Sequence, residues 1–129
     1  MLTLEKIRYK KVLQQIDLDL EEGKLYSLFG KNGVGKTTLL KVITRIWEPS
    51  YGSIRWRGMD LSGMSRKELA KLYTLVPQGG GGSFSYTIEE FVMMGRYSFS
   101  EKVSNIDYYL EMVGISHLKN KRIDQISLG

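Results

Sequence analysis

The most informative stretch of this sequence is Gly30-Lys31-Asn32-Gly33-Val34-Gly35-Lys36-Thr37. It satisfies the pattern G-x-x-x-x-G-K-[ST] in full, and a chance match in so short a chain is rarer than about one in a hundred. Glycines let such a loop aim successive backbone N–H groups at phosphate oxygens, and the helix that follows adds the positive end of its dipole. The stretch therefore predicts a site for the phosphates of a nucleoside triphosphate.

The side chains at the end of this stretch have distinct predicted roles. Lys36 is expected to reach the β- and γ-phosphates and so to be catalytic, and the hydroxyl of Thr37 is expected to be a ligand of Mg²⁺. Thr38 adds contacts at the α-phosphate. The loop residues predicted to bind the nucleotide are Asn32, Gly33, Val34, Gly35, Lys36, Thr37 and Thr38.

The residues on either side of the loop predict a strand before it and a helix after it. Residues 25–29 are mostly apolar and stop at Gly30, as expected of a buried strand that enters a glycine-rich turn. After Lys36, apolar residues recur at helical spacing until Pro49, which ends the predicted helix. The expected apolar face of that helix consists of Leu39, Leu40, Ile43, Ile46 and Trp47.

Further elements follow from local patterns. Residues 2–9 and 12–20 alternate apolar and polar side chains and predict antiparallel strands. A turn over residues 49–52 precedes a strand that contains Ile54 and Trp56, which ends at a turn formed by Arg57-Gly58. Residues 73–76 predict another strand.

Helix starts are marked by polar capping residues. Ser65-x-x-Glu68 and Thr87-x-x-Glu90 are capping boxes, so helices are expected directly after Ser65 and Thr87, the second ending at Gly95. Ser104 is predicted to cap a helix over residues 105–113, closed by Gly114. The tyrosines and methionines between residues 91 and 112 are expected to be packing residues.

Composition limits the classes of protein. The 129 residues, 42% hydrophobic and 26% charged, fit one globular domain, and the absence of cysteine excludes disulfides and thiolate metal sites. The net charge of +5 is scattered among acids, which does not favour direct nucleic-acid binding. No apolar run is long enough to span a bilayer and no secretory leader is evident, so a cytoplasmic location is expected, with any membrane role through a partner.

The loop and its surroundings resemble the ABC transporter ATPases. Residues 30–40 are similar to the Walker A segment of that family, which usually reads G-P-N-G-x-G-K-S/T-T-L-L, with Lys31 in place of the usual proline. The resemblance implies that Tyr9 stacks on adenine. The alternative is that Tyr9 is a half-buried aromatic residue of a strand without a functional role. Val76-Pro77-Gln78 resembles the Q-loop, which implies catalytic and Mg²⁺-sensing roles for Gln78, where the alternative is an ordinary loop residue.

The resemblance extends to the end of the chain. Residues 86–96 resemble the start of the helical subdomain in importers of iron-siderophore, haem and cobalamin type, and residues 126–129 resemble an altered signature motif with Leu128 in place of its first glycine. In that family the Walker B carboxylates and a later histidine follow the signature. The sequence is therefore interpreted as the N-terminal half of such an ATPase, for which turnover by this half alone is not expected.

The predicted architecture is an α/β fold. It combines a P-loop NTPase core and an antiparallel β subdomain over residues 1–78 with a helical subdomain over residues 86–129, truncated before Walker B. Residues 79–85 contain the run Gly79-Gly80-Gly81-Gly82-Ser83, interpreted as a flexible loop or an engineered linker.

Three functions fit this sequence. The leading hypothesis is the ATP-binding subunit of an importer of metal chelates, using ATP and Mg²⁺, working as a homodimer with a membrane permease at the inner face of the cell membrane. The second is a truncated or engineered P-loop module that binds ATP without turnover. The third is a soluble ABC ATPase without a transport role.

Overall fold

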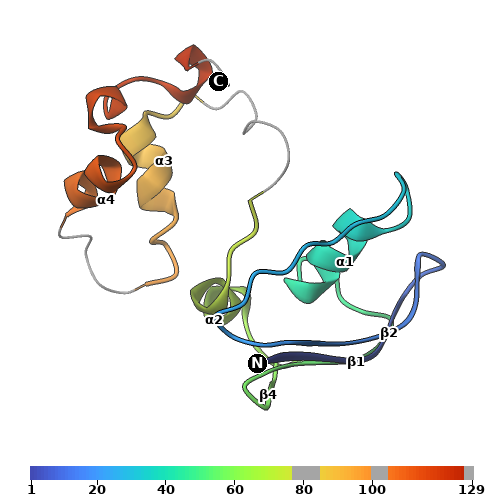
Figure 1. Ribbon diagram of the computed structural model, residues 1–129. Helices are drawn as coiled ribbons and strands as arrows, with labels where there is room; N and C mark the ends of the chain where they lie inside the picture. The colour runs from blue at the N-terminus through green and yellow to red at the C-terminus, as the bar shows by residue number, and fades with distance from the viewer. Residues whose placement is uncertain (77–84, 100–104, 127–129) are drawn as a thin grey trace. The chain divides into compact units, whose positions relative to one another are not determined.

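The computed structural model describes residues 1–76, 85–99 and 105–126 (Figure 1). The chain divides into two compact units, Met1–Leu75 and Val76–Gly129, and each is described by itself. Pro77, Gln78, the glycine run from Gly79, Ser104 and the partial signature at Ser127, Leu128 and Gly129 lie outside the described residues.

The first unit contains a four-stranded antiparallel sheet. Its strands are β1 (Leu2–Tyr9), β2 (Leu13–Leu20), β3 (Tyr51–Trp56) and β4 (Met59–Asp60), in the order β2-β1-β3-β4. The two predicted N-terminal strands are confirmed, and they pair antiparallel. The predicted turn at Arg57-Gly58 is also confirmed: φ is 50° at Arg57 and 80° at Gly58, as in the two-residue type I′ turns that match the twist of a hairpin.

A bulge shapes the middle of this sheet. The register between β1 and β3 shifts between Glu5 and Arg8, and Lys6 has a φ of 51°. Gly52, predicted to belong to a turn, instead lies in β3 opposite this bulge. A Cβ atom on Gly52 would lie 2.4 Å from the carbonyl oxygen of Glu5 and 2.6 Å from that of Lys6, so only glycine fits there.

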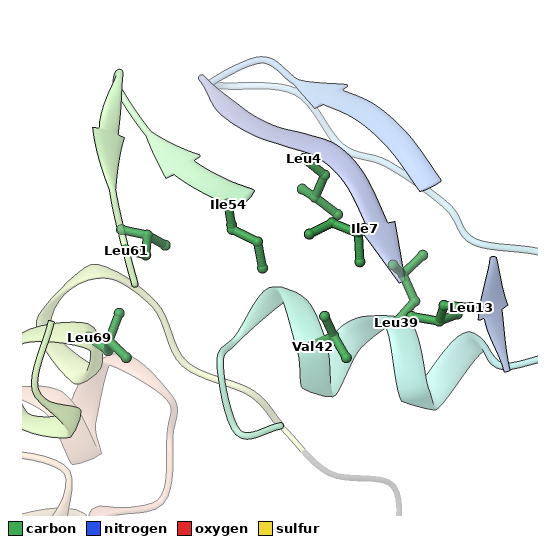
Figure 2. Packing of buried hydrophobic residues seen from close by; sticks show 8 residues of the cluster. All are labelled: Leu4, Ile7, Leu13, Leu39, Val42, Ile54, Leu61 and Leu69. Atoms are coloured by element: carbon green, nitrogen blue, oxygen red, sulfur yellow. The ribbon is translucent and has the colours of Figure 1, made fainter. Parts of the chain in front are cut away.

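The core of the first unit lies between the sheet and a helix. Helix α1 (Lys36–Ile43) directs Leu39 and Val42 toward the strands, where they meet Ile7 and Leu13 (Figure 2). Each such side chain contributes about 1.5–3 kcal/mol when fully buried. The buried cluster consists of Leu4, Ile7, Leu13, Leu39, Val42, Ile54, Leu61 and Leu69.

Helix α1 is shorter than predicted. It ends at Ile43, because Arg45 takes a left-handed φ of 50° and its N–H donates to the Val42 carbonyl, three residues back, at 2.9 Å. Leu39 is buried as expected, but Leu40 and Ile46 are 42% and 44% exposed. The predicted apolar face was therefore too broad, and Pro49 is not what ends the helix.

The two predicted strands at residues 25–29 and 73–76 are wrong. Neither segment is a strand, and Leu25 is 96% exposed, Phe29 87% and Val76 85%. A strand forms only where a neighbouring strand pairs with its N–H and C=O groups. Within the described residues no strand pairs with either segment.

Helix α2 (Arg66–Leu72) completes the first unit. The predicted capping box is confirmed: the Ser65 hydroxyl accepts from the Glu68 N–H, and the Glu68 carboxylate accepts from the Ser65 N–H at 2.7 Å. Arg66 donates to the carbonyls of Arg45 and Ile46, which ties α2 to the segment after α1.

The second unit contains α3 (Ile88–Met94), α4 (Ile106–Met112) and the 3-10 helices η1 (Ser116–Leu118) and η2 (Ile123–Gln125). Thr87 and Glu90 form the predicted capping box of α3, and Gly95 is its C-cap. The N-cap of α4 is Asn105, whose side chain accepts from the Tyr108 N–H at 3.0 Å, so the assignment of this cap to Ser104 was wrong.

A charged cluster links the helices of the second unit. The ammonium of Lys119 lies 2.7 Å from Asp107 on α4 and 3.3 Å from Glu89 on α3. Hydrogen bonds to these two carboxylates raise the pKa of Lys119. Contrary to the sequence interpretation, many large apolar side chains of this unit are at least 45% exposed: Phe91, Met93, Met94, Tyr108, Tyr109 and Met112.

Across residues 1–76, 85–99 and 105–126, no helix is both long and apolar enough to cross a membrane.

Candidate phosphate-binding site

The glycine-rich loop enters α1 through two left-handed glycines. Gly33 has a φ of 80° and Gly35 a φ of 105°. These angles are costly for residues with a Cβ atom, so the two glycines are required by the path of the chain. Within the loop, the Val34 N–H donates to the Lys31 carbonyl at 3.3 Å. The loop therefore folds into a tight turn directly before the helix.

Lys36 lies across this loop. Its ammonium donates to the carbonyl of Gly30 at 2.7 Å and to that of Lys31 at 2.9 Å. The side chain thus folds back from the first turn of α1 toward the start of the loop. In this position the ammonium can exchange carbonyl oxygens for the more strongly accepting oxygens of a phosphate.

The start of α1 offers unpaired donors. Its N-cap is Gly35, which has no side chain to cap the helix, and its first turn contains no acidic residue. Among the described residues, the amides of Gly35, Lys36 and Thr37 donate to no acceptor. Unpaired N–H groups and the positive end of the helix dipole together favour an anion at this point.

The remaining predicted loop residues lie around the same turn. Asn32, Val34 and Thr37 are exposed, and Thr38 is half-buried. The hydroxyl of Thr37 is an oxygen donor, the type of ligand that a hard cation such as Mg²⁺ prefers. Within the residues that the structure describes, no group of three His, Cys, Asp or Glu side chains could hold a metal ion.

The N-terminal hairpin contacts the loop. A Cβ atom on Gly35 would lie 2.9 Å from Cγ1 of Val12 and 3.3 Å from Cδ2 of Leu13. Tyr9 pairs with Leu13 across the hairpin, and its carbonyl accepts from the Val12 N–H at 3.1 Å. The structure therefore brings the strand end that carries Tyr9 next to the loop, whereas Gln78 lies outside the described residues.

One neighbour of the predicted site was missed from the sequence. The ring of Tyr9 is stacked on that of Trp47, with centroids 5.4 Å apart and planes 6° from parallel. The spacing of apolar residues predicts Trp47 on the apolar face of a helix. No local pattern pairs residues 9 and 47, because their contact depends on how α1 lies on the sheet.

Comparison with known proteins identifies the family. The sequence model of the family described as ABC transporter matches residues 13–129. The chain belongs to this family, as its Walker A segment predicted.

Individual relatives are importer ATPases or proteins described only by their family. The chain is 36% identical to an uncharacterized ABC transporter ATP-binding protein of Haemophilus influenzae. It is 34% identical to the hemin import ATP-binding protein HmuV of Bordetella avium and 30% identical to the petrobactin import ATP-binding protein YclP of Bacillus subtilis. Each match covers 93% of the chain and 48–50% of the relative, so the chain spans about half the length of these curated relatives.

Solved structures agree on the fold. The chain is similar to cbiO1 of Clostridium perfringens, part of the transporter complex cbiONQ, with a TM-score of 0.69 and 27% identity over 98% of this chain and 55% of the other. It is also similar to an inward-facing ABC transporter described as metal-chelate type, with a TM-score of 0.70 and 27% identity over 98% and 49%. The predicted α/β fold of an ABC ATPase cassette is therefore confirmed.

Proposed function

We propose that this chain is the ATP-binding part of an ABC-type importer and that the imported solute is a metal chelate, such as an iron-siderophore complex, haem or cobalamin. Two of the relatives above are named for the import of hemin and petrobactin, and one similar structure is described as metal-chelate type. These names support the solute class. In such systems the residues that contact the solute belong to other subunits, so the sequence of the ATPase does not identify the solute directly.

The observation that carries the proposal is the group of unpaired amides at the start of α1, with the Lys36 ammonium beside it. In the proposed complex these amides and Lys36 bind the β- and γ-phosphates of ATP, and Thr38 contacts the α-phosphate. Thr37 and Gln78 hold Mg²⁺, which neutralises phosphate charge when bound, and Gln78 also orients the attacking water. Tyr9 stacks on the adenine.

The proposed partners follow from the family and the solute class. The assembled importer has a membrane permease subunit, and two ATPase subunits act as a homodimer. In this proposed assembly the ATPase lies in the cytoplasm, at the inner face of the cell membrane. Copurification of the tagged ATPase with a permease from solubilised membranes tests this assignment, and a tagged ATPase that is recovered free of any membrane protein would favour a soluble ABC ATPase.

Titration of the purified chain with Mg·ATP by calorimetry tests the phosphate site. We expect saturable binding that is lost in Lys36→Ala, because that variant removes the ammonium beside the unpaired amides. Lys31→Ala is the matched control: it removes an exposed lysine from the same loop, and ATP binding should be retained. Equal binding by the Lys36→Ala variant, or no binding by the unsubstituted chain, would contradict the proposed site.

A further inference from the structure

The stacked pair of Tyr9 and Trp47 is not explained by phosphate binding. Tyr9 is the last residue of β1 and is half-buried, whereas Trp47 follows α1 and is 36% exposed. Their rings are nearly parallel, with centroids 5.4 Å apart. The contact joins two segments that are 38 positions apart in the sequence, so it fixes the ring of Tyr9 relative to the helix that carries the phosphate loop.

We propose that Trp47 is a positioning residue for the nucleotide base, which it serves by holding the ring of Tyr9 in place. This inference rests on the proposed ATP-binding function. Tyr9 contacts the base with one face of its ring, while Trp47 supports the ring and does not itself contact the nucleotide.

Trp47 is held in place by contacts with helix α1. The backbone N–H of Trp47 donates to the Lys41 carbonyl at 3.0 Å, and the Lys41 ammonium lies 4.4 Å from the centroid of the indole ring. Lys41 is in the last turn of α1. The indole is therefore contacted by both Lys41 and Tyr9, and these contacts hold it against α1. In the proposed arrangement Trp47 supports the ring of Tyr9, and the ring of Tyr9 stacks on the base.

The ring of Tyr9 is half-buried and also contacts a flexible side chain. The ammonium of Lys10 lies 5.3 Å from the centroid of this ring, at the end of an exposed and flexible side chain. A base can displace such a group or lie beside it at little cost. Because the hairpin touches Gly35 through Val12, this platform also lies on the element that contacts the phosphate loop.

A preformed platform improves binding because the ligand does not have to order it. Fixing one rotamer-rich side chain in advance changes affinity by up to about tenfold. This gain applies only to ligands that carry a base. Inorganic tripolyphosphate carries the phosphates alone, so comparing it with ATP separates the platform from the phosphate loop.

The test is calorimetry of the full chain with Mg·ATP and with magnesium tripolyphosphate, for the unsubstituted protein and for Trp47→Leu and Trp47→Phe. We expect the unsubstituted chain to prefer ATP. Trp47→Leu should weaken ATP binding by about three- to tenfold with tripolyphosphate binding unchanged, and Trp47→Phe should restore most of the preference because it retains an aromatic ring.

Three results would overturn the inference. Trp47→Leu could retain the full preference for ATP, both ligands could weaken together as expected of a purely structural role, or the unsubstituted chain could bind both ligands equally. The last result would leave the phosphate site intact. Failure of the unsubstituted chain to bind either ligand would remove the proposed function itself, and this inference with it.

A second measurement leaves Trp47 in place. In a Trp56→Phe background Trp47 is the single tryptophan of the chain. We expect its fluorescence to change with ATP but not with tripolyphosphate, because only ATP brings a base to the stacked pair. Identical responses to the two ligands would contradict the proposal even if Trp47→Leu failed to fold.

Discussion

Substitution of Gly52 by alanine should destabilise the first unit more than the same change at Gly58. Both glycines have positive φ, 94° at Gly52 and 80° at Gly58, so alanine costs about 1–2 kcal/mol at either position from the backbone alone. The space around them differs. Nothing lies within 4 Å of a Cβ atom on Gly58, whereas one on Gly52 would lie 2.4 Å and 2.6 Å from the backbone carbonyl oxygens of Glu5 and Lys6.

These carbonyls belong to β1, which is paired on both sides, so relieving the overlap means moving the sheet. Overpacking of this kind adds about 1–3 kcal/mol, which brings the expected cost of Gly52→Ala to roughly 2–5 kcal/mol. With a urea dependence of about 1 kcal/mol per molar, its unfolding midpoint should fall about 1–3 M below that of Gly58→Ala.

Urea titration followed by tryptophan fluorescence measures this difference, since both tryptophans, Trp47 and Trp56, lie in the first unit. A midpoint for Gly52→Ala equal to or above that of Gly58→Ala would refute the reasoning. It would mean that β1 and β3 do not approach each other as the bulge requires.

Three further predictions concern a surface ion pair, a helix cap and the phosphate loop. Hydrogen bonds from Arg57, and then from the N-terminal amino group, lower the pKa of Glu22 from 4.5 to about 2. The stabilising effect of the Glu22 carboxylate is therefore complete above pH 4.5 and is lost as the pH falls toward 2. In acid unfolding curves the difference in stability between the unsubstituted chain and Glu22→Gln should shrink over that range, and a constant difference would count against the ion pair. Asn105→Ala should cost about 1 kcal/mol by removing the acceptor of the Tyr108 amide, seen as faster hydrogen exchange in α4, and unchanged exchange would argue against this cap. Gly35→Ala should weaken Mg·ATP binding in calorimetry by about tenfold or more, because its φ of 105° is unfavourable for alanine, and unaltered affinity would mean that the loop binds phosphate in another conformation.

The parts of the structure that were predicted correctly depend on neighbours in the sequence. The capping boxes at Ser65 and Thr87 need only residues three positions apart, and the turn at Arg57-Gly58 needs only its own backbone angles. The turn formed by the glycine-rich loop is also local, since Gly33 and Gly35 set its path, whereas its phosphate-binding role stays a prediction. Patterns of this range can be read from one sequence because the interactions that they encode are complete within it.

The errors depend on distant partners. Residues 25–29 have the apolar composition of a buried strand, but composition does not supply the neighbouring strand that would pair with them. Gly52 was placed in a turn because glycine is common in turns, whereas its reason for being glycine lies in β1, more than 40 positions earlier in the chain. The stacking of Tyr9 on Trp47 likewise cannot be predicted from the sequence, because it depends on how helix α1 packs on the sheet.

Local and distant contacts both hold the glycine-rich loop, residues 30–37, in this chain. Its far end is anchored by α1, where Leu39 and Val42 are buried in the core, and its side is anchored by the contact of Val12 with Gly35. The segment that enters the loop has no such anchor among the described residues, since Phe29 is 87% exposed. The unpaired amides that favour phosphate are at the anchored end. The proposed binding of phosphate therefore depends little on the entering segment. Lys36, in the first turn of α1, connects the two ends of the loop, because its ammonium donates a hydrogen bond to the carbonyl of Gly30.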